Sequence, residues 1–141
     1  MKQKIEFTVY GKPEALKRHR HFKMATRIAT YDPSKEDKKD FLSVAISNKP
    51  DVPFDEPIEV TFDFFFPRPK NHYRTGKFSG MLKDNAPVWH TSTPDIDNTS
   101  KLIMDSLNKV FWRDDSIICS IIALKRYSET PRTEITIETI D

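Results

Sequence analysis

The chain has 141 residues, 37% of them hydrophobic, and a formal net charge of +2 at pH 7. This length suffices for one core without disulfides or a structural metal, so we expect a single domain over residues 1–141. The one cysteine, Cys119, excludes an intrachain disulfide. The sequence has no apolar run of about 18 residues and no apolar signal-peptide core near Met1. We therefore expect a soluble, cytoplasmic protein without membrane association.

The small net charge hides two basic stretches. Residues 11–27 contain six lysines and arginines against one acid, and residues 68–83 contain five against none. Acidic residues are concentrated around residues 95–115 and at the end of the chain. A protein with this separation of charge can attract a polyanion with one region and hold a cation with another.

In the first half of the chain, three segments show periodic patterns. Residues 5–10 alternate apolar and polar side chains up to Gly11, which predicts a half-buried strand. Asp32-Pro33 supplies an N-cap and a first helical position, and the helix should end at Pro50. Residues 58–66 have five apolar side chains on one side, which is the clearest strand pattern in the chain.

The second half begins with a polar, basic segment over residues 67–94. Loops of this length are uncommon in compact domains and are often binding loops. A helix should follow from between Asp95 and Asn98 to about Asn108, then a buried strand in the apolar run 117–124, and an alternating strand over 133–140. The predicted order is strand, helix, strand, long loop, helix, strand, strand. This is an α+β fold with a single mixed sheet and two helices.

Several charged residues lie at the start of the second predicted helix, within it and just after its end. Asp95 and Asp97 lie at its start, Lys101 follows Asp97 by one helical step of four, and Asp114 and Asp115 form a turn after its end. Carboxylates that converge on one point repel each other unless a cation lies between them. Hard oxygen ligands suit Mg²⁺ or Mn²⁺.

A purely structural interpretation explains the same residues. Acids in the first turn of a helix are favoured by capping and by the helix dipole, and Asp-Asp-Ser is ordinary turn chemistry. Lys101 is then the centre of a surface ion-pair ladder. An Asp-x-Asp pair is a weak signal by itself, so spacing leaves both interpretations open.

A longer ordered pattern runs from residue 94 to residue 117. It consists of Pro-Asp-Ile-Asp-Asn at 94–98, then Lys101, Asp105, Leu107 and Asn108, and finally Trp-Arg-Asp-Asp-Ser-Ile at 112–117. This pattern resembles the signature of the RusA-like Holliday junction resolvase family. Gly11-Lys12-Pro13 near the start and Lys125-Arg126-Tyr127 before the last strand extend the resemblance over nearly the whole chain.

The resemblance implies a RusA-like fold and a homodimeric, Mg²⁺-dependent endodeoxyribonuclease, often encoded by phages and prophages. Such an enzyme resolves four-way DNA junctions by paired nicks during recombination and repair. Matched by position, the family's acidic residues fall on Asp95, Asp97 and Asp115, with Asp114 as a further metal-ligand candidate. The motif lysine falls on Lys101. The chain departs from the pattern at Thr99-Ser100, where an apolar residue usually follows the asparagine, and this loosens the apolar face of the helix.

The implied chemistry suits these residues. A carboxylate-bound Mg²⁺, with Mn²⁺ as the alternative, activates water and neutralises phosphate charge, while Lys101 stabilises the developing negative charge. A twofold dimer matches a twofold junction. The alternative function is a non-catalytic module that binds branched or duplex DNA, or a nuclease for another structured nucleic acid.

The basic stretches supply candidate phosphate contacts, although exposed basic loops are often only solubilising. These candidates are Lys17, Arg18, Arg20, Arg68, Lys70, Arg74 and Lys77. The aromatic residues of the loop, Trp89 and His90 among them, either stack on bases or pack under the loop, and we expect packing.

Overall fold

A computed structural model describes residues 2–17, 20–23 and 28–141, with the side chains of residues 20–23 and 28–30 excepted. The strands are β1 (Lys4–Tyr10), β2 (Arg20–Lys23), β3 (Ile28–Tyr31), β4 (Ile58–Phe66), β5 (Ile118–Tyr127) and β6 (Arg132–Thr139). The helices are α1 (Lys35–Ala45) and α2 (Ile96–Leu107), with short 3-10 helices η1 (Ile46–Asn48), η2 (Lys70–His72), η3 (Gly76–Phe78) and η4 (Asp115–Ile117). Within these ranges, no helix has the length and apolar character needed to cross a bilayer.

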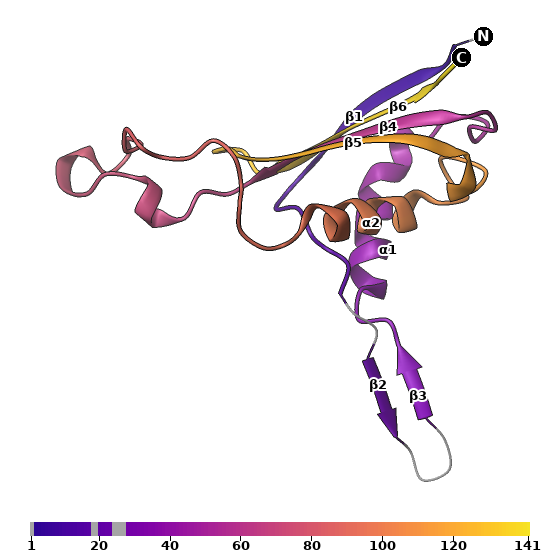
Figure 1. Ribbon diagram of the computed structural model, residues 1–141, viewed down its shortest axis with the longest axis horizontal. Helices are drawn as coiled ribbons and strands as arrows, with labels where there is room; N and C mark the ends of the chain where they lie inside the picture. The colour runs from indigo at the N-terminus through magenta and orange to yellow at the C-terminus, as the bar shows by residue number, and fades with distance from the viewer. Residues whose placement is uncertain (1, 18–19, 24–27) are drawn as a thin grey trace.

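Four strands form one mixed sheet in the order β1-β6-β4-β5. β4 is antiparallel to β6 and parallel to β5, so β5 forms one edge of the sheet. Both helices lie against the same face of the sheet (Figure 1). The predicted α+β fold, with one mixed sheet and two helices, is therefore confirmed.

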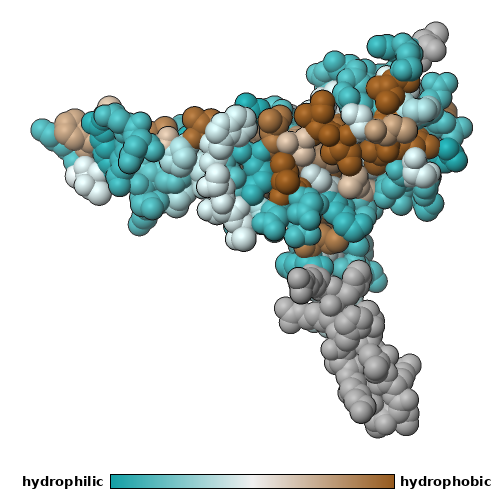
Figure 2. All heavy atoms as spheres, viewed as in Figure 1, coloured by the Kyte–Doolittle hydropathy of each residue, from teal (hydrophilic) through white to brown (hydrophobic). Residues whose placement is uncertain are grey.

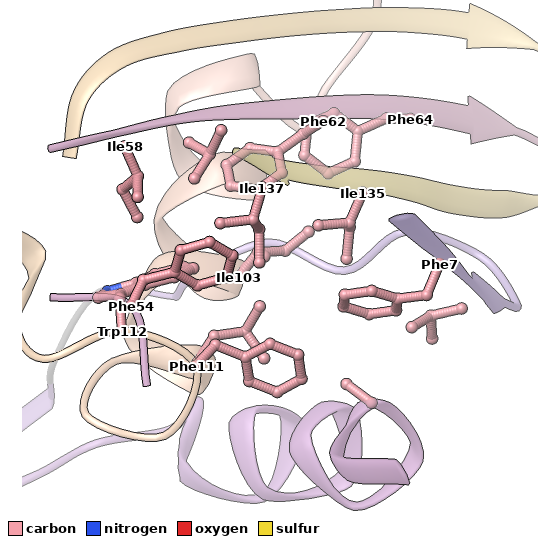
Figure 3. Close-up of a cluster of buried hydrophobic side chains, with 14 of the residues drawn as sticks. Phe7, Phe54, Ile58, Phe62, Phe64, Ile103, Phe111, Trp112, Ile135 and Ile137 are labelled. Carbon is pink, nitrogen blue, oxygen red and sulfur yellow. The ribbon is translucent and has the colours of Figure 1, made fainter. Parts of the chain in front are cut away.

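The core lies between this face and the helices (Figure 3). Every second side chain of β4 points into it, and Phe62 and Ile58 are completely buried, which confirms the strand predicted from the period-two pattern. Ile103 and Leu107 of α2 pack into the same cluster. Because two turns of α2 are anchored in this way, the position of its N-terminus relative to the sheet is fixed.

The segment before α1 differs from the prediction. A two-stranded hairpin, β2 and β3, was not predicted, because two four-residue strands are too short to show a convincing alternation. The N-cap of α1 is Ser34 rather than Asp32. The Asp32 carboxylate instead accepts a hydrogen bond from the Ser34 backbone N–H at 2.9 Å, which makes a turn before the helix.

The strand β5 was predicted to be buried, and this is wrong. Ile121 and Ile122 point to opposite faces of the sheet, and they are 49% and 44% exposed. In the space-filling view, apolar side chains gather along this edge (Figure 2). Among the described residues, no strand pairs with the outer edge of β5 between Ile118 and Leu124.

Residues 67–94 leave the sheet after β4 and project from it as a separate arm (Figure 1). The arm folds back on itself, because the Arg74 N–H donates to the Met81 carbonyl and the Lys83 N–H donates to the His72 carbonyl. Its returning strand pairs with the end of β5 through the His90 N–H and the Lys125 carbonyl. The predicted long loop is thus an ordered arm that leads directly into α2.

Candidate functional site

Asp95 and Asp97 lie together where the arm enters α2. The Asp95 carbonyl accepts the first helical hydrogen bond, from the Thr99 N–H at 3.1 Å, but the Asp95 carboxylate makes no capping bond. Within the described part of the chain, neither carboxylate has a hydrogen-bond or ion-pair partner, and both residues are exposed. Capping through the side chain therefore does not account for Asp95, and both carboxylates are available to a ligand.

Lys125 fixes the segment that precedes Asp95. From β5 its ammonium donates to the carbonyl of Ser92 at 2.8 Å and to that of Pro94 at 2.6 Å. Burial lowers the pKa of Lys125 below its ordinary value, and the negative charge of Asp95 opposes this effect. Sequence reasoning assigned Lys125 no role beyond the resemblance. A lysine that ends an otherwise apolar run was the only local signal of these contacts.

Lys101 lies one turn after Asp97 on α2. Its ammonium is 3.5 Å from a carboxylate oxygen of Asp105, and its side chain is 57% exposed. Exposed helical ion pairs of this kind contribute only about 0.3–0.5 kcal/mol, so Lys101 can exchange its partner at little cost. Of the ion-pair ladder expected from the spacing, only the step from Lys101 to Asp105 is present, and it does not prevent contact with an added anion.

Asp114 and Asp115 lie at the opposite end of α2. Asp115 accepts a hydrogen bond from the indole N–H of the buried Trp112 at 2.8 Å. Asp114 caps η4: hydrogen bonds from Ser116, with a further one from Lys109, lower its pKa to about 2. Each carboxylate thus has at least one partner within the turn.

The two pairs of aspartates do not meet in one chain. The 12 residues of α2 span about 18 Å; Asp97 lies in its first turn, and Asp115 follows its C-terminal end in η4. Within the described residues, no three aspartate, glutamate, histidine or cysteine side chains lie close enough together to hold one metal ion. The structure brings Asp95 beside Asp97, and Asp114 beside Asp115, without joining the two pairs.

The predicted phosphate contacts on the arm are in different environments. Lys70 and Lys77 are exposed, and Arg74 forms a surface ion pair with Asp84 at 3.0 Å. Arg68 lies at the base of the arm, where its guanidinium donates to the Pro87 carbonyl at 2.7 Å. Arg68 therefore joins the outgoing and returning strands of the arm, while the other three cations remain accessible.

The N-terminal candidates can be placed only in part. The Lys17 ammonium lies 3.4 Å from Asp37 of α1 and is 59% exposed. Arg18 lies outside the described residues. The backbone of Arg20 belongs to β2, but its side chain also lies outside the description.

His90 and Trp89 have opposite environments. The His90 ring stacks on Phe66 with 3.9 Å between ring centroids and meets the edge of Tyr127, so it packs as expected. Trp89 does not pack as expected, because it is 53% exposed. Trp89 and Asp95 line the same open hollow of about 520 Å³.

The packing of His90 predicts a pH-dependent stability. Burial lowers the pKa of His90 from its ordinary value of 6.5, and the positive charges of Lys125 and, to a smaller extent, Lys12 lower it further. A histidine whose pKa is lower in the folded state stabilises the fold fully above about pH 6.5, and this contribution disappears as the pH falls through the folded-state pKa. The free energy of unfolding, measured with urea, should therefore fall more steeply between about pH 7 and pH 5 for the wild type than for His90→Phe. Parallel pH curves would contradict this assignment.

Comparison with known proteins places the chain in a family. The family model described as endodeoxyribonuclease RusA matches residues 10–138. A similar curated protein, "Uncharacterized protein YqaN" of Bacillus subtilis (strain 168), is 31% identical over 138 residues, which cover 96% of each chain. The match includes the whole of α2 with both pairs of aspartates. The chain therefore belongs to the RusA endodeoxyribonuclease family of Holliday junction resolvases.

Proposed function

We propose that this protein is a Mg²⁺-dependent endodeoxyribonuclease that resolves Holliday junctions by paired hydrolysis of two opposed strands. The observation that carries the proposal is the pair of unpartnered carboxylates, Asp95 and Asp97, at the start of α2 in a chain of this family. Exposed carboxylate oxygens are the donors that Mg²⁺ prefers, so these residues fit the metal. Mn²⁺ should be an acceptable substitute because it takes the same kind of ligands.

Each residue then has a chemical role. Bound Mg²⁺ would supply a water that is nucleophilic near neutral pH and would neutralise charge on the phosphate. Asp95 and Asp97 would hold the ion, and the ammonium of Lys101, one helical turn from Asp97, would stabilise the negative charge that develops on the phosphate. The contacts of Lys125 with the Ser92 and Pro94 carbonyls fix the backbone that carries Asp95.

Asp115 joins this site through a second copy of the chain. Asp115 lies in η4 directly before β5, and Lys125, close to Asp95, lies near the end of β5. Antiparallel pairing of two β5 edges over Ile118 to Leu124 would bring Asp115 of the second copy toward the end of this free segment, where the arm pairs with Lys125. Both copies would then contribute carboxylates to each of two sites, and two sites related by a twofold axis match the symmetry of a four-way junction.

The surface of β5 supports this arrangement. Its free edge from Ile118 to Leu124 has apolar side chains on both faces, including Ile121 and Ile122. Natural proteins usually protect an exposed edge strand with charges, prolines or bulges, because such an edge pairs readily with another strand. Pairing of two copies would bury these isoleucines and satisfy the backbone groups of the edge.

The arm supplies the surface for the DNA backbone. It carries five cations between Arg68 and Lys83, while Asp84 is the only acid between Pro67 and Pro94. The arm leads directly to Asp95, so a strand that follows its positive charge reaches the carboxylates. These contacts are with phosphates and contribute affinity that does not depend on base sequence.

The first test is cleavage of a labelled four-way junction with Mg²⁺. Asp97→Asn should reduce the cleavage rate by at least about a hundredfold, because it removes a metal-binding charge, and junction binding should remain. Asp51→Asn, an exposed acid outside the proposed site, should cleave like the wild type. Undiminished cleavage by Asp97→Asn would refute the site. Binding without cleavage by the wild type would favour the non-catalytic alternative.

The second test mixes two inactive variants, Asp97→Asn and Asp115→Asn. If each site combines Asp97 of one copy with Asp115 of the other, a mixed dimer has one site with both substitutions and one site with neither. The mixture should therefore nick one strand of the junction, although each variant alone does not. If all the carboxylates of a site came from one chain, every site would carry a substitution, and the mixture would remain inactive.

The third test concerns the arm. The double substitution of Lys70 and Arg74 by alanine should weaken junction binding and reduce the slope of log K against log salt by about two, one for each lost phosphate contact. The matched control substitutes Lys35 and Lys39 of α1, two exposed lysines remote from the arm. An unchanged slope in the arm variant would show that these cations do not contact phosphates.

A further inference from the structure

Trp89 is an exposed aromatic residue held on a fixed backbone. Of the two tryptophans in the chain, Trp112 is completely buried and Trp89 is 53% exposed. The residues on both sides of Trp89 pair with β5: the His90 N–H donates to the Lys125 carbonyl, and the Tyr127 N–H donates to the Val88 carbonyl. The exposure of Trp89 therefore does not result from a loose loop. Large aromatic residues presented in this way are typical of binding surfaces.

The indole of Trp89 is already positioned by a cation. The Arg126 guanidinium carbon lies 5.7 Å from the centroid of the Trp89 ring, within the range of a cation–π contact. Asp63 holds the same guanidinium in place through a contact of 2.7 Å. The orientation of the indole is thus supported from within the protein, and the rest of its surface is open to a ligand.

The residues that line the hollow beside Trp89 are complementary to a nucleotide. Ile96 and Leu124 give it apolar walls, and Asp95 and Lys125 give it charged groups. The hollow has a volume of about 520 Å³ and is open to solvent, so a base can enter it from the side. A nucleotide whose phosphate lies at Asp95 would therefore have its base at an apolar surface that includes an indole.

We propose that Trp89 stacks on a nucleobase of the cleaved strand, next to the phosphate that is hydrolysed, after this base has left the duplex stack at the branch point. The proposal rests on the proposed function, because it takes the site at Asp95 and Asp97 as the place of cleavage. Every base has a face that can stack, so the contact favours unpaired bases over continuous duplex without selecting a sequence. Trp89 thus contributes to recognition of the branch, while the arm contributes charge.

The contact can be followed by tryptophan fluorescence, because one of the two tryptophans is exposed and the other is buried. The full chain with Asp97→Asn is titrated with a four-way junction and, separately, with a duplex of the same sequence. The junction should change the tryptophan emission, and most of the change should be lost when Trp89→Phe is added, because the remaining Trp112 is buried and reports only on its hydrogen bond with Asp115. An equal change with both proteins would overturn the proposal. Failure of acrylamide to quench the Trp89 emission in the absence of DNA would also overturn it, because this would indicate that a second copy covers the indole.

Affinity measurements test the same contact independently. Trp89→Ala should weaken junction binding by about tenfold and duplex binding much less, and Trp89→Tyr should recover part of the loss. Tyr10→Ala is the matched control, because Tyr10 is 71% exposed, belongs to β1 at the opposite edge of the sheet from β5, and does not line the hollow. Equal losses with junction and duplex would overturn the proposal.

Junctions with one abasic nucleotide locate the stacked base. The abasic residue is placed in turn at each position around the branch point, and one position should weaken wild-type binding as much as Trp89→Ala does. At that position the two losses should not add, because each removes the same contact. Additive losses at every position would overturn the proposal. Cleavage by the wild type is measured separately, so failure of the nuclease assignment remains distinguishable from failure of this contact.

Discussion

The packing of α2 against the sheet is the constraint on which the candidate site depends. Ile103 and Leu107 anchor the helix in the core, and Lys125 of β5 holds the segment that enters it. Asp95 and Asp97 therefore lie at the N-terminal end of the helix, near the end of β5. Asp115 follows the C-terminal end of the helix, near the start of β5. The same packing that fixes one pair of carboxylates keeps the second pair about one helix length away.

The elements predicted correctly were those whose pattern depends on local periodicity. β4 has five alternate apolar residues, and α2 begins at Ile96 and ends at Leu107, close to the limits expected from its spacing. The error in β5 has a different cause. An apolar run predicts that a strand is covered, but it does not show whether the rest of the same chain covers it. The positions of Asp95 and Asp97 followed from sequence, whereas their distance from Asp115 required the three-dimensional structure.

The contacts of the site that sequence reasoning missed join residues that are distant in the chain. Lys125 reaches the Ser92 and Pro94 carbonyls across more than 30 positions, and Arg126 reaches Asp63 from the neighbouring strand. No local spacing signals such pairs. Trp89 was misjudged for a related reason: an aromatic residue in a basic loop is usually buried under it, but here pairing with β5 turns His90 inward and leaves Trp89 outside.

The edge of β5 connects these features. Its C-terminal part is covered by the returning strand of the arm, and its N-terminal part, where Ile121 and Ile122 lie, pairs with no other described strand along this edge. If a second copy pairs there in the antiparallel direction, the second copy and the arm would meet beside Lys125. Lys125 is the residue that holds the segment before Asp95. Assembly, the metal ligands and the hollow lined by Trp89 would then meet at one place. A twofold pair would present that place twice, with opposite strand polarity, which is the symmetry that paired cleavage of a four-way junction requires.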